Sequence, residues 1–278
     1  MRPRAAGLAL AALVLLALGA RAAPPPDTAE GILSFGNALL RSGDSFRAAT
    51  EYLRILHHFP DAPEALRALE GLGRAYALAG RWDEAAQAFG RLQELAPSAE
   101  HRRLWAGALY RAGRYAEAAR AALVPDAGEE DRTLGTLARL RAGMGGAPGE
   151  RGDLRAEYEA LPRKSPAAAG LLSAVLPGAG HLYTGRPRDA AVALVLNGAF
   201  LWGTWQAARA DQWALAGILG ALELGWYGGT ITSSMNAAHK WNRREEGRFF
   251  SRWEAGALPR WDLVFLPGGG AAVATWTW

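Results

Sequence analysis

Few residues of this chain are arranged in a pattern that could carry out chemistry. Its 278 residues include no cysteine, which excludes a thiol nucleophile, disulfides and cysteine-bound zinc. The histidines do not have the spacing of metal ligands: His57, His58, His101, His181 and His239. No phosphate-binding loop, G-x-S-x-G or H-E-x-x-H motif occurs. We therefore expect no catalytic residue, no cofactor and no metal, and we interpret the protein as not an enzyme.

One acidic residue has an unusual position. Glu223 lies inside a long apolar run, where a charge is costly unless it is protonated or paired. Two interpretations remain open. Glu223 forms a polar contact between helices, with Asn197 and Tyr227 on the same polar face, or it belongs to a proton or ligand site with His181 or His239. We favour the polar contact.

The region from residue 28 to 126 contains three copies of one sequence pattern. In each copy a glycine is followed five residues later by an alanine, with an aromatic residue between them. The glycines are Gly43, Gly80 and Gly113, the aromatics Phe46, Trp82 and Tyr115, and the alanines Ala48, Ala85 and Ala118. Such a glycine ends one helix and turns the chain, and the alanine marks a close approach of two helices. The pattern predicts three helical hairpins.

These units resemble the tetratricopeptide repeat family. The middle unit carries Leu72, Gly73, Tyr76, Ala85, Phe89 and Pro97 at the family's positions, and the first carries Phe35, Gly36, Leu39, Ala48, Tyr52 and Pro60. The third departs from the pattern, because Ala106 replaces the glycine and Ala122 replaces the aromatic residue. The resemblance implies an all-α solenoid of about three repeats that binds other proteins on its concave surface.

The family's groove-facing positions carry mostly arginine in this sequence. They are Asn37, Arg41, Arg67, Glu70, Arg74, Arg103, Tyr110 and Arg111. Arginine binds carboxylates with two parallel hydrogen bonds, so we predict a groove for an extended or helical peptide that carries carboxylates. The alternative is that these arginines form a solvated face without a ligand.

Other segments flank the repeats. Residues 1–22 are typical of a signal peptide, because Arg2 and Arg4 precede an apolar run that ends in small residues. An uncleaved anchor helix is the alternative, and both place the following chain outside the cytoplasm. A proline-rich spacer covers residues 23–27. Residues 127–164 are expected to form degenerate capping helices and a linker.

Residues 165–241 have the composition of a membrane domain, with helices expected near 166–176, 190–208 and 213–235. Basic residues flank the two long runs, and tryptophans lie near their ends. Small residues recur every four positions, a spacing that lets helices pack closely in lipid or that arises from composition alone. This small-residue ridge comprises Gly217, Ala221, Gly225, Gly229 and Ser233, facing Ala199, Gly203 and Ala207. The signal peptide and the basic flanks agree only if residues 166–185 also cross, which gives the three passes that we favour; two passes, against the charge rule, are the alternative.

The start of this region also resembles a known signature. Pro177, Gly178, Gly180, Tyr183 and Gly185 match the P-G-x-G-x-x-Y-x-G pattern of small bacterial two-helix membrane domains, although glutamine is commoner where His181 stands. The resemblance implies a membrane location and no activity.

We therefore predict a non-catalytic scaffold or adaptor in the bacterial inner membrane, with its repeats in the periplasm. An amphipathic tail with a β-hairpin is expected at 242–278. The expected partners are another envelope protein or peptide and the lipid bilayer. A net charge of +4 without a basic cluster interleaved with aromatics argues against nucleic acid. The alternatives are a membrane component of a transport or protein-insertion system and an outer-membrane assembly factor.

Overall fold

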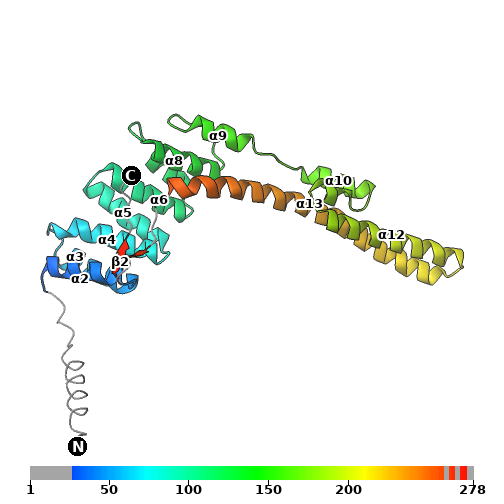
Figure 1. The fold of residues 1–278 in the computed structure, drawn as a ribbon, viewed down its shortest axis with the longest axis horizontal. Helices are drawn as coiled ribbons and strands as arrows, with labels where there is room; N and C mark the ends of the chain where they lie inside the picture. Colours follow the sequence, from blue (N-terminus) through cyan, green and yellow to red (C-terminus); the bar gives the residue numbers. More distant parts are fainter. Residues whose placement is uncertain (1–26, 260–262, 267–269, 274–278) are drawn as a thin grey trace, which may run out of the picture. The chain divides into compact units, whose positions relative to one another are not determined.

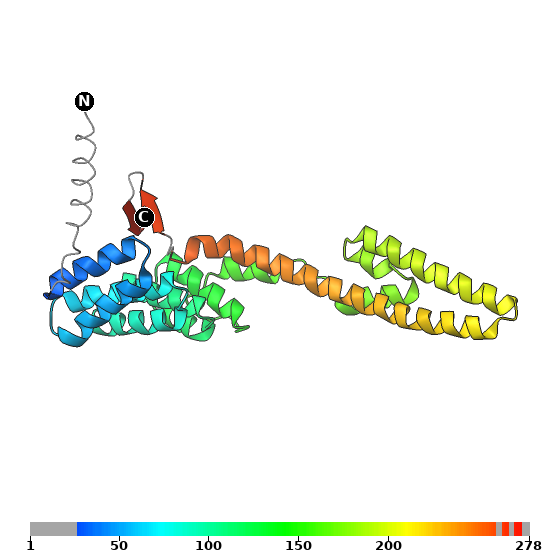
Figure 2. The same cartoon turned by 90° about the horizontal axis from the view of Figure 1, so that it is seen from below.

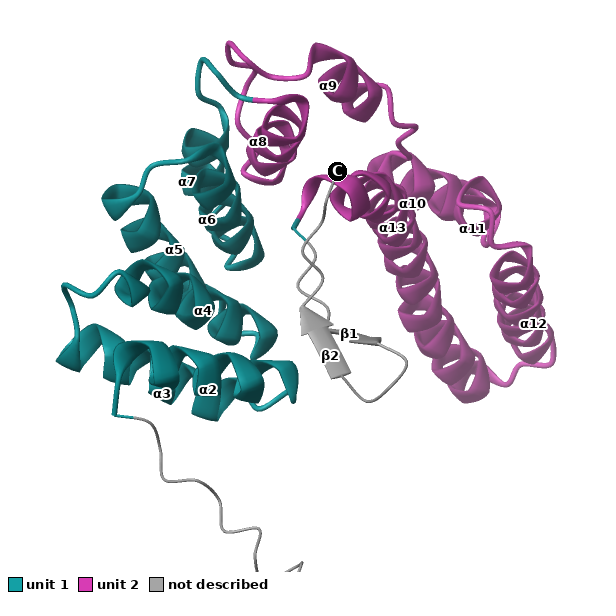
Figure 3. Cartoon of the chain, turned by 60° about the vertical axis from the view of Figure 1, so that its left-hand side comes forward, with its two compact units in different colours: residues 1–127, 259–278 teal, residues 128–258 magenta. Residues whose placement is uncertain are grey.

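The computed structural model describes residues 27–259, 263–266 and 270–273. The predicted signal peptide (1–22) and nearly all of the predicted spacer (23–27) lie outside the described residues. The chain divides into two compact units, the first made of residues 1–127 and 259–278 and the second of residues 128–258 (Figure 3).

The first unit contains a stack of helical hairpins (Figure 1). Its helices are α2 (Ala29–Arg41), α3 (Ser45–His58), α4 (Glu64–Leu78), α5 (Trp82–Leu95), α6 (Ala99–Arg111) and α7 (Tyr115–Ala122). Thr28, Asp44 and Ser98 cap three of them by accepting a hydrogen bond from a backbone N–H in the first turn. The turns inside the three hairpins use the predicted glycines in the left-handed region, with φ of 86° at Gly43, 72° at Gly80 and 76° at Gly113.

The core of the first two repeats is built from one aromatic residue against small ones. Tyr52 and Phe89 are fully buried. The Tyr52 ring packs between Gly36 and Gly71, and the Phe89 ring packs on Gly73, where a Cβ atom would come within 2.5 Å of a ring carbon. The three repeat alanines are also 0% exposed, which confirms the predicted close approach of paired helices: Ala48, Ala85 and Ala118.

The second unit is organised around α13 (Trp213–Ala257), a helix of 45 residues. Its other helices are α8 (Glu129–Arg141), α9 (Gly152–Glu159), α10 (Pro166–Val175), α11 (Ala179–Tyr183) and α12 (Pro187–Arg209). Helix α12 runs antiparallel to the N-terminal half of α13, and Figure 2 shows the two side by side. The turn between them places Asp211 in the left-handed region, at φ 55°.

Helix α13 continues well past the predicted end near residue 235. The boundary predicted between 241 and 242 falls inside this helix, which no proline interrupts before Pro259. The predicted capping helices pack on this continuation. Phe249 and Phe250 contact the ring of Tyr158 on α9, and Arg141 on α8 donates a hydrogen bond to Glu254 at 2.8 Å.

In the tail, strands β1 (Leu263–Leu266) and β2 (Gly270–Val273) pair antiparallel. Leu263 lies opposite Val273, and Leu266 lies opposite Gly270. The loop between the strands lies outside the described residues.

Among the described helices, none combines the length and the apolar character needed to cross a membrane. The predicted passes at 166–176, 190–208 and 213–235 are therefore not confirmed. Helix α10 has only 10 residues, and polar residues such as Asn197 and Glu223, together with many glycines, interrupt the two longer runs.

Candidate functional site

A polar cluster surrounds the hydroxyl group of Tyr52. The side chain starts on α3, crosses the core and donates a hydrogen bond to Oδ1 of Asn37 on α2 at 2.7 Å. Burial raises the pKa of Tyr52 to about 12, even though Arg41 and Arg74 act in the opposite direction. These electrostatic effects place Arg41, Arg74 and Glu70 near the hydroxyl group. Predicted groove residues from α2 and α4 thus come together around one buried tyrosine.

Two of the predicted arginines on α4 are engaged in ion pairs along their own helix. Arg74 donates hydrogen bonds from Nε and Nη2 to Oε1 of Glu70, at 2.9 and 2.6 Å. Arg67 binds Glu64 at 3.1 Å, and 63% of the Arg67 side chain is exposed. In contrast, Arg41 is exposed and forms no ion pair within the described part of the chain. An incoming carboxylate would therefore meet Arg41 first.

The third repeat differs from the prediction in one residue. Tyr110 is only 5% exposed and packs edge-on against Tyr115 at the start of α7, with ring centroids 5.1 Å apart. It belongs to the core rather than to an exposed groove. Arg103 is partly buried, and Arg111 is exposed with its guanidinium group 5.8 Å from the centre of the Trp82 ring. We call Asn37, Arg41, Arg67, Glu70, Arg74, Arg103 and Arg111 the arginine face.

The predicted polar face of the second unit does not form one cluster. Tyr227 donates a hydrogen bond to the carbonyl oxygen of Ala174 at 2.8 Å, toward α10. Asn197 donates to the carbonyl oxygen of Ala193 at 2.6 Å and to the hydroxyl group of Thr230 at 3.4 Å. Glu223 is 5% exposed, and neither carboxyl oxygen has a hydrogen-bond partner within the described residues. Burial raises the pKa of this carboxyl group.

The P-G-x-G-x-x-Y-x-G segment has a packing explanation. Gly178 adopts φ 94° after α10 ends, so the chain reverses there as a broken helix. A Cβ atom at Gly180 would collide with the backbone of Ala169 on α10, and the amide of Gly180 donates to the hydroxyl group of Ser173 at 3.1 Å. The motif therefore brings α11 into close contact with α10.

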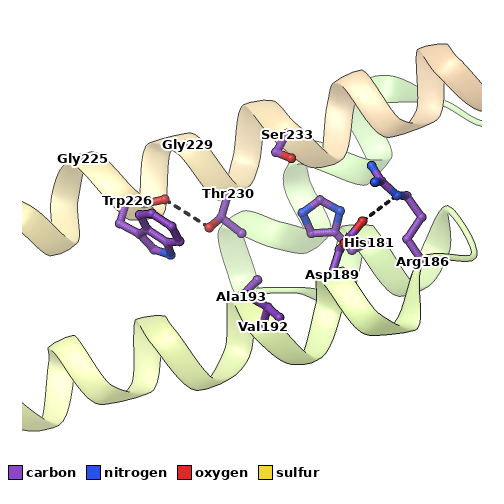
Figure 4. Close-up of a pocket in the computed structure, with 10 residues that line it drawn as sticks. All are labelled: His181, Arg186, Asp189, Val192, Ala193, Gly225, Trp226, Gly229, Thr230 and Ser233. Carbon is purple, nitrogen blue, oxygen red and sulfur yellow. Dashed lines mark hydrogen bonds and ion pairs between the residues drawn. The ribbon is translucent and has the colours of Figure 1, made fainter.

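A cavity of about 520 Å³ lies between α11, α12 and α13, and sequence reasoning missed it (Figure 4). The residues that line it include His181, Arg186, Asp189, Trp226 and Gly229. The spacing of Gly225 and Gly229 was the available signal, but the sequence pattern predicts close helix packing there. In the structure a Cβ atom at Gly217, Gly225 or Gly229 would meet nothing within 4 Å, so these glycines do not form the predicted tight contact.

Within the described residues, no three histidine, cysteine, aspartate or glutamate side chains are grouped so that they could hold a metal ion.

Residues 33–100 and 79–129 match the profile of the tetratricopeptide repeat family. This part of the chain is a tetratricopeptide repeat array, as the first two cores and the hairpin glycines indicate. Repeats of this family generally mediate protein–protein interaction. No curated protein matches the chain.

Proposed function

We propose that this protein is a non-catalytic scaffold of the bacterial envelope. Its repeat array binds a peptide or protein segment that carries carboxylates, and its second unit binds a lipid bilayer. The observation that carries the proposal is the arginine face, where Arg41 is exposed beside the Tyr52–Asn37 hydrogen bond and has no ion pair with any residue that the structure describes. A planar guanidinium group binds a carboxylate with two parallel hydrogen bonds.

The arginine face suits an acidic partner for a second reason. The Asn37 oxygen is already held by Tyr52, and Glu70 by Arg74, so the positions of both are set before a ligand arrives. A preorganised surface loses less conformational entropy on binding. Exposed arginines contribute modestly one at a time, so we expect an affinity that depends on several contacts and on ionic strength.

The bilayer proposal rests on exposed apolar side chains in the second unit. Val175 is 79% exposed and Leu224 is 78% exposed. Others that are at least half exposed are Leu171, Leu176, Leu182, Val192, Leu194, Val195, Leu201, Trp202, Trp213, Ile218 and Leu222. Soluble monomers rarely expose so many large apolar side chains on adjacent helices. We propose that the α12–α13 hairpin inserts these exposed apolar side chains into the bilayer.

The charged residues favour a membrane with anionic lipids. Trp202 and Trp213 lie near the turn of the hairpin, whereas Arg188, Lys240 and Arg243 are exposed at the opposite end of its apolar part. Tryptophan favours the bilayer interface, and basic side chains bind anionic head groups. The signal-peptide pattern of residues 1–22 supports the inner membrane, with the repeats in the periplasm.

Peptide binding by the full chain tests the first half of the proposal. The probes are two labelled helical peptides of equal length, one rich in glutamate and one rich in lysine, measured by fluorescence anisotropy. We expect the acidic peptide alone to bind, and Arg41→Glu to weaken it at least fivefold. Arg91→Glu is the matched control, because Arg91 is an exposed arginine on α5 outside the arginine face. Equal binding of both peptides, or equal losses in both variants, would reject the groove.

Flotation with vesicles tests the second half. The full chain is mixed with phosphatidylcholine vesicles, with and without phosphatidylglycerol. We expect binding that increases with the anionic lipid, and a loss of at least tenfold in the double variant Trp202→Ser, Trp213→Ser. Leu95→Ser is the control, since Leu95 is 53% exposed but lies on α5 of the repeats. A chain that does not float, or a double variant that floats as well as the wild type, contradicts the bilayer proposal.

A further inference from the structure

The cavity between α11, α12 and α13 is a second place where a ligand fits. Its volume of about 520 Å³ is within the range of small-molecule sites, roughly 300–1,000 Å³. All of its lining residues come from the second unit. The cavity does not include any residue of the arginine face, so its ligand is separate from the partner proposed for the repeats.

The cavity exists because side chains are missing where two helices face each other. Gly225 and Gly229 lie on its α13 wall, and Ala193 lies on its α12 wall. Glycine lowers the stability of a helix interior, and close packing against a neighbouring helix usually offsets this loss. No such contact is made here, since a Cβ atom at Gly225 or Gly229 would meet no atom within 4 Å. The glycines therefore provide space for a ligand rather than contact between helices.

One end of the cavity is polar. His181 is only 3% exposed, its ring projects into the space between α12 and α13, and its Nδ1 atom has no hydrogen-bond partner within the described residues (Figure 4). A buried nitrogen without a partner is unfavourable, so a ligand atom that bonds to it gains affinity. Burial lowers the pKa of His181, Arg186 lowers it further and Asp189 opposes this, so the imidazole is neutral at pH 7.

Two further features at this end favour an anion. Arg186 lines the cavity and uses Nε to bind Asp189 at 2.6 Å, and a guanidinium group has other N–H donors to offer. Helix α12 begins at the next residue, and no side chain caps its N-terminus. An uncapped helix N-terminus attracts negative charge through its free N–H groups. Asp189 is the one carboxylate in the lining, and it competes with a ligand for Arg186.

The other end is apolar. The Trp226 ring and Val192 line it, together with Ala193 and the two glycines. The hydroxyl group of Thr230, also in the lining, already donates to the carbonyl oxygen of Trp226 at 3.1 Å. This end therefore offers van der Waals contact to an aliphatic chain.

From this arrangement we propose that the cavity binds an acidic amphiphile, an aliphatic chain that ends in a carboxylate or a phosphate. The anionic head lies against His181, Arg186 and the N-terminus of α12. The chain lies along Gly225 and Gly229 and against Trp226. Both a free fatty acid and a phosphate-headed lipid have this chemistry.

Photo-crosslinking of the full chain tests whether an acidic amphiphile binds in the cavity. The probe is a fatty acid with a diazirine in its chain, added to the protein in phosphatidylcholine nanodiscs, and labelled peptides are identified by mass spectrometry. We expect saturable labelling of the segment 225–233 and at least a tenfold loss in Gly229→Leu, which fills the cavity. Gly228→Leu is the matched control, because a Cβ atom at Gly228 also meets nothing within 4 Å but Gly228 does not line the cavity.

If Gly229→Leu does not fold, Ser233→Leu replaces it, since Ser233 is an exposed residue that also lines the cavity. Labelling that is unsaturable, or equal in wild type and in the cavity-filling variant, overturns the proposal. So does labelling that is spread over exposed positions such as Leu171 and Trp202 without enrichment at 225–233.

Competition by unlabelled compounds identifies the head group. An alkyl phosphate and a fatty acid of equal chain length should both compete with the probe. The stronger competitor shows whether the ligand is a phosphate-headed lipid or a free fatty acid. Asp189→Asn should strengthen their competition severalfold, because it releases Arg186. A fatty alcohol that competes equally overturns the acidic head, and inorganic phosphate that competes alone overturns the need for a chain.

Discussion

The hydroxyl group of Tyr52 reaches Oδ1 of Asn37, 2.7 Å away, from the opposite side of the first repeat's core. The tyrosine is fully buried, while Asn37 belongs to the exposed face of α2. One side chain thus joins the packing of the repeat to the surface on which we expect a ligand.

Replacing Tyr52 by phenylalanine should destabilise the array at neutral pH and protect it at high pH. Losing the hydrogen bond costs about 1 kcal/mol of the free energy of unfolding at pH 7. The pKa of Tyr52 is raised from 10.0 to about 12 in the folded state, so the wild type loses stability as the pH rises from 10 to 12. That loss approaches roughly 2.7 kcal/mol, at about 1.36 kcal/mol for each pKa unit.

Denaturant unfolding at pH 7 and pH 11, followed by circular dichroism, measures both effects. The difference between wild type and Tyr52→Phe should shrink or change sign at the higher pH. If absorbance at 295 nm shows that Tyr52 ionises near pH 10, the hydroxyl group of Tyr52 is not buried as described.

Adding one methyl group at Gly73 should destabilise the second repeat. The Cβ atom of Gly73→Ala would come within 2.5 Å of the Phe89 ring, and Phe89 is fully buried and cannot move aside. Overpacking of this kind costs about 1–3 kcal/mol. Gly247→Ala is the control, because nothing lies within 4 Å of its Cβ position on α13. We expect a lower unfolding midpoint for the first variant and an unchanged or higher one for the second.

The repeats could be predicted from sequence because each characteristic residue has one structural explanation within its own hairpin. A turn at Gly80 requires a left-handed residue, and Ala85 must be small where two helices meet. The second unit lacks such unambiguous signals. Glycines every four residues favour close packing or leave a cavity, and only the position of the facing helix decides between the two.

Two other differences have similar causes. Tyr110 has the spacing of a groove residue, but its ring packs edge-on against Tyr115 and is part of the core. Helix α13 extends to Ala257 because its polar second half is stabilised by α8 and α9, through contacts such as those of Phe249 with Tyr158. Neither contact is visible in the local sequence pattern.

Truncating Phe249 should loosen the attachment of α8 and α9 to α13. Phe249 is 1% exposed and lies within 5.3 Å of both Tyr158 and Phe250, measured between ring centroids. Phe249→Ala removes this packing and should lower the free energy of unfolding by about 3–5 kcal/mol. Hydrogen exchange should show faster exchange in both α9 and residues 242–257. Exchange that increases in α13 alone would mean that α9 is held by other contacts.

Replacing Glu223 by leucine should stabilise the second unit, and more so at higher pH. Both oxygens of the buried carboxyl group lack a partner within the described residues, and a buried polar group without a partner costs about 1–3 kcal/mol. Burial raises the pKa of Glu223 above 4.5, so the folded state favours the protonated form. The wild type therefore loses stability as the pH rises through that raised pKa, and Glu223→Leu does not. Unfolding of both proteins from pH 4 to pH 8 should show a difference that widens with pH. A variant that is less stable than the wild type at pH 8 would show instead that the ionised Glu223 has a favourable partner.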